Sequence, residues 1–216
     1  MMDGLVYKVQ TYQENSKLLF VYTNKGKYTL ISKGSLKMNS STRIVSQYLT
    51  LISFEESNKK MFTLKNSSIV DDYSNIKNDY QMTKNAASIL EVLDKLIYDE
   101  FEHEKIYIEA TNALNGNLSY SHITFLIRIL FYLGYAPNIR GDGRKVVGMN
   151  AEFGGIIYQG ENHYLDLNYD ETVLLLRLVS KNNEEIMIDK KLIEKLIYFI
   201  VKYYQYHLQI SLKTLQ

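Results

Sequence analysis

The sequence predicts an α+β fold, in which a small N-terminal β-barrel is followed by an all-α helical domain with a glycine-rich insertion. Three observations lead to this prediction. Short runs of β-branched and aromatic residues, separated by polar turns, fill the N-terminal third of the chain. After Asp71-Asp72 the apolar period changes from two residues to 3.6. Seven of the eleven glycines and the only proline then fall within residues 134–160.

Five strands are expected in the barrel: Leu5–Thr11, Lys17–Thr23, Tyr28–Ser32, Tyr48–Glu55 and Met61–Val70. The second and third are joined by a polar hairpin turn in which Gly26 can adopt a positive φ. A long polar loop, Gly34–Thr42, interrupts the sheet. Five short strands with one long loop in mid-sheet fit an OB-fold. The strand count fits an SH3-like barrel nearly as well, so both remain open at this point.

Helical periodicity dominates the rest of the chain. Helices are expected at Asp79–Phe101, Ile106–Leu114, Ile123–Leu133, Tyr169–Ser180 and Lys190–Leu208. The third of these is apolar nearly all round, which predicts a buried central helix. A small hairpin is expected near Phe153–Tyr158 and His163–Leu165. The expected domains are therefore residues 1–75 and 76–216, with an irregular insertion at about 135–167.

The positive charge is concentrated in the predicted barrel. Between Lys8 and Lys65 there are ten Lys or Arg and three Glu, a net charge of +7, whereas the whole chain is +1. Binding to nucleic acid depends mainly on cations that neutralise phosphates, so this asymmetry favours a DNA-binding module. The candidate DNA-binding residues are Lys8, Lys17, Lys25, Lys27, Lys33, Lys37 and Arg43. Four interleaved tyrosines, Tyr7, Tyr12, Tyr22 and Tyr28, are candidate stacking platforms for bases. The alternative is a solvated surface that protects the sheet edges, with half of these tyrosines in the core.

Several functional classes are excluded or disfavoured. The chain has no cysteine, so disulfides, thiolate zinc sites and cysteine nucleophiles are ruled out. No phosphate loop and no nucleophile–base arrangement occurs, so we expect neither an enzyme nor a cofactor. No apolar run is long enough to span a membrane, and the first residues lack a signal-peptide pattern. We expect a cytoplasmic, nucleoid-associated protein without membrane contact.

The order of several short motifs resembles the RecO family of recombination mediators. Gly4-Leu5-Val6, Gly26-Lys27, Lys33-Gly34-Ser35 and Ser41-Thr42-Arg43 match the family's N-terminal pattern, and further motifs follow in order. These are Leu133-Gly134-Tyr135-Ala136-Pro137-Asn138, Phe153-Gly154-Gly155, and Tyr206-His207-Leu208 with Leu212-Lys213-Thr214. Many members carry a zinc site after the Pro-Asn and Gly-Gly elements. This chain has no cysteine there, so we expect no metal.

The resemblance implies an OB-fold domain, a helical domain and a role in DNA repair. It implies a non-enzymatic recombination mediator that binds single- and double-stranded DNA and anneals complementary strands. Together with the partner RecR, it would help to load the recombinase RecA onto DNA coated with single-strand-binding protein. Its action on RecA would be indirect. The alternatives are an OB-fold scaffold for protein interactions and an RNA-binding module, both without intrinsic DNA annealing.

Two arginines of the helical domain are candidate partner-binding residues. Arg128 is the only charge in an apolar helix, where a lone arginine is often held by a carboxylate such as Glu91 or Asp94. The resemblance implies a second role, in which Arg128 clamps the C-terminal tail of single-strand-binding protein. Arg177 presents the same two alternatives.

Overall fold

The computed structural model describes residues 1–38, 40, 42–180 and 188–216, which form two compact units. The first unit, Met1–Asn112, holds the strand-rich region and the helices that follow it. The second unit, Ala113–Gln216, holds three long helices and a small sheet. The predicted α+β fold class is confirmed. The predicted domain boundary near residue 75 stays a prediction.

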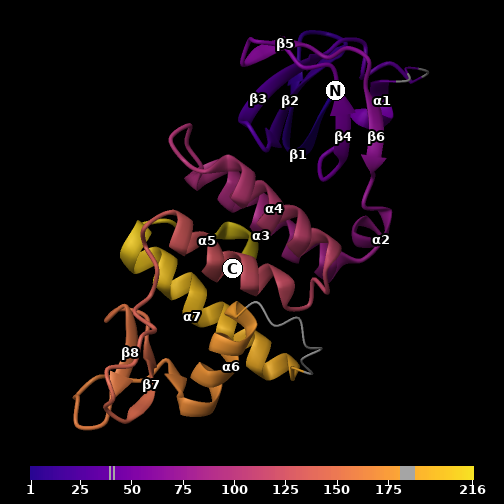
Figure 1. Ribbon diagram of the computed structural model, residues 1–216. Coiled ribbons are helices and arrows are strands. Elements are labelled where there is room, and N and C mark those ends of the chain that lie inside the picture. The colour runs from indigo at the N-terminus through magenta and orange to yellow at the C-terminus, as the bar shows by residue number, and fades with distance from the viewer. Residues whose placement is uncertain (39, 41, 181–187) are drawn as a thin grey trace. The chain divides into compact units, whose positions relative to one another are not determined.

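Six strands form the sheet of the first unit. They are β1 (Met2–Tyr12), β2 (Ser16–Thr23), β3 (Gly26–Ser32), β4 (Leu51–Phe54), β5 (Met61–Thr63) and β6 (Ser68–Asp71). Their order is β5-β3-β2-β1-β4-β6, and only the β3–β5 pair is parallel (Figure 1). The sheet is not closed by a continuous ladder in the described residues. One backbone hydrogen bond, from Glu55 N to Lys65 O at 3.2 Å, joins the end of β4 to the segment after β5.

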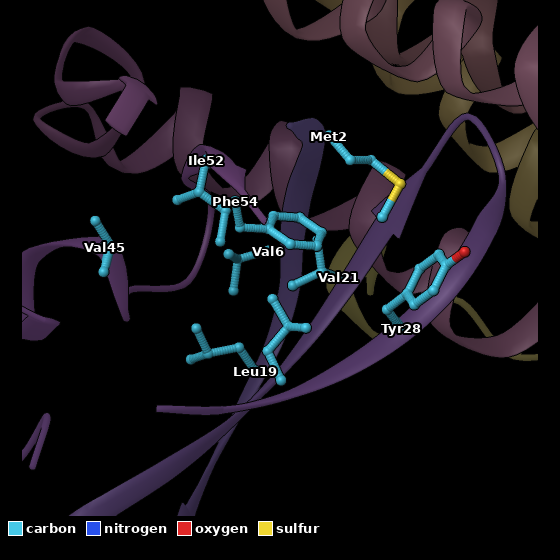
Figure 2. Close-up of a cluster of buried hydrophobic side chains, with 9 residues drawn as sticks. Met2, Val6, Leu19, Val21, Tyr28, Val45, Ile52 and Phe54 are labelled. Carbon is cyan, nitrogen blue, oxygen red and sulfur yellow. The ribbon is translucent and has the colours of Figure 1, made fainter. Parts of the chain in front are cut away.

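The inner face of this sheet encloses an apolar cluster. Val6, Leu19, Val21, Leu30 and Ile52 are fully buried, and Figure 2 shows Val6, Leu19, Val21 and Ile52 in the same cluster as Phe54. Residues of β3 alternate between buried and half-buried, as a two-residue period requires. Each fully buried Leu, Ile or Val contributes about 1.5–3 kcal/mol, so this cluster fixes the register of the three-stranded meander β1–β2–β3.

Two of the predicted strands differ in the structure. The expected strand Met61–Val70 is two strands, β5 and β6, because the chain turns between them, where Asn66 adopts a φ of +44°. The expected strand Tyr48–Glu55 is shorter, since Leu49 has a φ of +53° just before β4. Helix α1 (Thr42–Val45) begins at the end of the predicted polar loop. Asn39 and Ser41 of that loop lie outside the described residues.

Helices α2 (Ser74–Lys77) and α3 (Tyr80–Leu96) complete the first unit together with most of α4 (His103–Asn115), which ends three residues beyond Asn112. Helix α3 begins after Asp79, whose side chain accepts a hydrogen bond from Met82 N at 2.8 Å. The predicted end at Phe101 is wrong, because the backbone of Ile97 is already extended. The apolar face predicted for this helix is buried, including Ala86, Ile89, Leu90, Leu93 and Leu96.

The second unit is built on α5 (Ser121–Tyr132), α6 (Tyr169–Val179) and α7 (Lys190–Leu208), followed by the short helix η1 (Lys213–Leu215). Asn168 and Glu171 form a reciprocal capping box at the start of α6. Asp189 caps α7 by accepting from Lys191 N at 3.2 Å. In the described residues no helix is long and apolar enough to cross a membrane.

The glycine-rich insertion is more ordered than the sequence suggests. It forms a three-stranded sheet of β7 (Val146–Asn150), β8 (Gly155–Tyr158) and β9 (Leu167–Asn168), in the order β8-β7-β9 (Figure 1). The expected pairing of Phe153–Tyr158 with His163–Leu165 is wrong, because β8 pairs with β7. Gly148 lies where β7 approaches β9 so closely that a Cβ would stand 2.2 Å from Leu167 O. Glycine is therefore required there, although in the sequence it looks like a strand breaker.

A histidine lies buried within the second unit. The Nδ1 of His122 lies 2.7 Å from Leu118 O, a carbonyl to which it can donate, and its Nε2 meets no partner among the described residues. Burial disfavours the charged form and lowers the pKa of His122 to about 4. The imidazole is therefore neutral in the folded protein at pH values at which the unfolded chain, with a pKa near 6.5, is protonated.

We predict that acid weakens the second unit through this residue. Because the folded pKa lies below the unfolded one, stability is complete above pH 6.5 and falls as the pH drops toward 4. Between pH 7.5 and 5 the free energy of unfolding should fall by about 2 kcal/mol. Urea unfolding at the two pH values measures this loss. In His122→Asn, which keeps a donor for Leu118 O but does not titrate, the loss should be much smaller. An equal loss in both proteins would contradict the assignment.

Candidate nucleic-acid interface

The outer face of the β1–β2–β3 meander carries two of the seven candidate DNA-binding residues, both of them lysines. Lys8 and Lys27 stand over aromatic rings, with each Nζ 5.4 Å from a ring centroid, that of Phe20 and that of Tyr7 respectively. Both ammonium groups also reach α3. Lys8 forms an ion pair with Asp94 Oδ2 at 3.1 Å, and Lys27 donates to the backbone carbonyl of Asp94 at 2.9 Å. Burial lowers the pKa of Lys27. These two cations therefore hold the helix against the sheet.

Two other candidate lysines also have partners within the first unit. Lys17 donates to Ser46 O at 3.1 Å, which ties β2 to the end of α1. Lys25, in the turn between β2 and β3, pairs with Glu56 Oε1 at 2.6 Å, with both side chains about half exposed. An exposed pair of this kind contributes little to stability, and either lysine can exchange its partner for a phosphate at small cost.

The remaining three candidates, Lys33, Lys37 and Arg43, are exposed, and their side chains form no hydrogen bond or ion pair in the described part of the chain. We call these three the loop cations. They follow β3, where the backbone is held by Ser35 Oγ donating to Ser32 O at 2.8 Å and by Leu36 N donating to Asn15 O at 3.2 Å. Fixed backbone and free cationic side chains are what a phosphate-contacting loop requires.

The tyrosines do not provide the expected row of stacking platforms. Tyr7, Tyr22 and Tyr28 are buried, and only Tyr12 is partly exposed. The hydroxyl of Tyr22 lies 3.2 Å from His103 Nδ1, so this ring joins β2 to α4. The expectation that Tyr7, Tyr22 and Tyr28 present their rings to bases is therefore wrong, and the alternative of core tyrosines is confirmed. In their place, the apolar groups exposed beside the loop cations are Leu36, Met38 and Ile44.

Arg128 is held by the end of a neighbouring helix. Its Nε donates to Val179 O and its Nη2 to Ser180 O, both at 3.0 Å. These are carbonyls at the C-terminus of α6, where the last turn lacks intrahelical donors and favours a cation. Arg177, in the last turn of α6, is exposed. The role of both arginines in binding a partner stays a prediction.

Two salt bridges and a cation–π contact of Arg144 link residues within the insertion. Arg144 pairs with Asp142 Oδ2 at 2.7 Å and Glu161 Oε1 at 2.8 Å, and its guanidinium stands 3.9 Å from the centre of the Tyr158 ring. Glu161 also accepts from Tyr158 N at 3.0 Å. No group of three or more His, Cys, Asp or Glu suited to a metal occurs among the residues that the structure describes.

Comparison with known proteins places this chain beside RecO. Residues 1–73, which cover the six strands, match the family model described as "Recombination protein O N terminal". The N-terminal third of the chain is therefore similar to the N-terminal region of RecO proteins. The sheet of the first unit has the OB-type fold.

Three relatives named "DNA repair protein RecO" define the extent of the similarity. The protein of Exiguobacterium sibiricum is 25% identical over 146 residues, which cover 64% of this chain and 59% of that protein. The protein of Exiguobacterium sp. strain AT1b is 28% identical over 65% of this chain and 59% of its own length. The Clostridium perfringens protein is 29% identical over 61% of this chain and 57% of its own. The matches therefore span less than two thirds of the length of these relatives.

A first prediction at this site concerns Arg128. Arg128→Met removes both donors that bind the C-terminal carbonyls of α6, and it should lower the free energy of unfolding by about 1–2 kcal/mol. Hydrogen bonds to charged groups contribute about 1.5–3 kcal/mol, and water partly replaces the lost bonds in the variant. Urea unfolding followed by circular dichroism measures the change. The matched control, Arg177→Met in the last turn of α6, should stay within about 0.5 kcal/mol of the parent. Equal effects of the two substitutions would show that the contacts of Arg128 do not stabilise α6.

Proposed function

We propose that this chain acts in DNA repair as a non-enzymatic recombination mediator that binds DNA through the loop cations Lys33, Lys37 and Arg43. The observation that carries the proposal is that these three are exposed and their side chains meet no partner among the described residues, and that they lie in the segment that matches the RecO N-terminal family. The relatives named for DNA repair support the role. The other four candidate lysines have partners in the fold, and we propose a secondary role for them in DNA contact.

The proposed binding is electrostatic and independent of base sequence. Lys33 and Lys37 on the loop and Arg43 in α1 form no ion pair in the described part of the chain, so phosphate contacts would cost no such pair there. Single- and double-stranded DNA both present phosphates, so both are proposed ligands. Annealing follows from the same chemistry, because neutralised phosphates reduce the repulsion between two complementary strands.

The proposed protein partners are RecR, the C-terminal tail of single-strand-binding protein and, indirectly, the recombinase RecA. For the acidic tail the second unit offers Arg177 as the more available cation, because two N–H groups of Arg128 already bind carbonyls of α6. A terminal carboxylate would bind Arg177 as a charge-assisted pair. The proposal for RecR assigns no surface.

The test of DNA binding is the salt dependence of affinity. We predict that Lys33→Glu/Lys37→Glu reduces the slope of log affinity against log salt concentration by about 1.4 on single-stranded DNA, because each lost phosphate contact removes about 0.7. Fluorescence anisotropy of a labelled oligonucleotide of thymine, titrated at four salt concentrations, gives this slope. Arg43→Glu should lower it further.

The control changes the net charge of the protein by the same amount at another place. Lys190→Glu/Lys191→Glu reverses two exposed lysines at the start of α7 and should leave the slope within error of the parent. Equal reductions in the two double variants would mean that only net charge matters, and would remove the loop cations from the proposed site. Absence of any binding by the parent at low salt would overturn the proposed function.

A second candidate function is favoured by the apolar side chains beside the loop cations. Leu36, Met38 and Ile44 are 39%, 85% and 56% exposed, and such a group suits a protein interface. In this case the OB module would be a scaffold for a protein partner. Lack of DNA binding by the parent, together with a retained pull-down of RecR that Met38→Glu abolishes, would favour the scaffold. A stronger preference for RNA over DNA oligonucleotides in competition would favour the RNA-binding alternative.

A further inference from the structure

A shallow hollow of about 320 Å³ opens in the first unit between the end of β4 and strand β5. Its lining includes Glu55, Glu56, Ser57, Lys59, Phe62 and Lys65. The volume is at the lower end of the range for small-molecule sites, so the hollow suits a single small group rather than a duplex. None of these residues belongs to the seven candidate DNA-binding residues.

The two carboxylates of the hollow are already engaged. Glu56 accepts from Lys25 Nζ at 2.6 Å, and Glu55 accepts from Asn66 Nδ2 at 2.6 Å. The two lysines of the hollow differ in this respect. Lys59 and Lys65 are exposed, and their ammonium groups form no hydrogen bond or ion pair within the described ranges. The Asn66 amide is neutral, so Glu55 keeps its negative charge, whereas Glu56 is neutralised by Lys25. With Lys25 counted, three ammonium groups stand against two carboxylates, and an anionic group would find two unpaired donors, Lys59 and Lys65, among the described residues.

The apolar part of the lining is an aromatic ring in a fixed position. Phe62 packs with its centroid 6.2 Å from the Tyr28 ring and 6.2 Å from the Phe54 ring, yet it remains half-buried and borders the hollow. Beside it, the Ser57 hydroxyl accepts from Lys59 N at 3.3 Å and keeps its own proton to donate. A ring, a hydroxyl and two free ammonium groups match the base and phosphate of a nucleotide.

The register of β5 connects this hollow with the loop cations. β5 runs parallel to β3, with Ile31 beside Thr63, and Leu64 N donates to Ile31 O at 3.0 Å. Because the two strands are parallel, their C-terminal ends lie at the same edge of the sheet. Lys65, which follows β5, and Lys33, which follows β3, therefore lie at that same edge. A strand that contacts the loop cations can continue to the hollow without crossing the outer face of the sheet that α3 covers.

We propose that the hollow is a nucleotide subsite for single-stranded DNA, in which one base contacts Phe62 and its phosphate lies between Lys59 and Lys65. The inference rests on the proposed function and adds a preference to it. Only an unpaired base can enter, so the subsite favours single strands over duplexes, whereas the loop cations bind both. It also supplies the base contact that the buried tyrosines do not.

The experiment uses a fifteen-nucleotide thymine strand with 2-aminopurine at every fifth position, and the matching duplex. Stacking of 2-aminopurine on Phe62 should quench its fluorescence in the parent complex. Lys59→Glu/Lys65→Glu should abolish the quenching and weaken single-strand binding about tenfold or more while weakening duplex binding much less. Phe62→Leu, which keeps an apolar side chain in the core, should lose quenching and about tenfold in single-strand affinity. Lys190→Glu/Lys191→Glu is the charge-matched control.

The outcomes separate this inference from the proposed function. If the parent binds both DNAs and the hollow variants behave as the control does, the subsite is wrong and the proposed function stands. If the hollow variants weaken single-strand and duplex binding equally, Lys59 and Lys65 are general phosphate contacts, and the nucleotide subsite is again wrong. If the parent binds neither DNA, the proposed function fails. Titration with the free nucleotide 2-aminopurine deoxyribose 5′-phosphate then tests whether the hollow binds a nucleotide. Quenching that Lys59→Glu/Lys65→Glu removes would support a nucleotide site, and no quenching would overturn it.

Discussion

Burial of both faces of the β1–β2–β3 meander is the constraint on which the rest of the first unit depends. The inner face packs Val6, Leu19 and Leu30 into the barrel core, where each is fully buried. The outer face is covered by α3, and its polar groups must find partners because buried polar groups without them are costly. Lys8 and Lys27 do so at Asp94, with their stems lying over aromatic rings. The cations of these strands are therefore used for stability, and the cations of the first unit that lack a partner among the described residues lie in the segments between strands.

The elements that could be predicted from sequence are those with local signals. Helix α7 spans the predicted Lys190–Leu208, because a capping Asp189 precedes a strict apolar period. Strand β7 was missed, because Gly148 interrupts its pattern and the reason for this glycine is a backbone 19 residues later in the chain. The division of Met61–Val70 into two strands depends on a positive φ at Asn66. Residues other than glycine rarely adopt a positive φ, so the sequence does not predict a turn at this position. Local propensity specifies helices well and says little about close approaches between distant segments.

The candidate site shows the same limit in electrostatic form. The charge of the N-terminal segment is evident in the sequence, but which lysines remain free depends on partners far along the chain. Lys8 meets a carboxylate 86 residues away, Lys27 a carbonyl 67 residues away, and Lys25 a carboxylate 31 residues away. No period or motif reports such pairings. The same holds for the tyrosines, since alternation places Tyr22 on the outer face but cannot say that α4 covers it. The DNA-binding role of the seven candidate residues therefore stays a prediction. Those without a partner among the described residues are the stronger candidates.

The near-neutral net charge of +1 is compatible with a role on DNA because screening makes charge local. At physiological ionic strength the Debye length is about 8 Å, so an exposed carboxylate farther away than this hardly weakens a phosphate contact. What matters is the charge that a strand meets along its path. On the first unit the proposed path offers Lys33, Lys37, Arg43, Lys59 and Lys65, none with an ion-pair partner within the described residues. Two carboxylates border the proposed subsite: Glu56 is paired with Lys25, and Glu55 keeps its charge because its partner, the Asn66 amide, is neutral. In the proposed site the ion pair of Lys25 with Glu56 therefore assists DNA binding, because it neutralises one of the two negative charges that a phosphate would meet there.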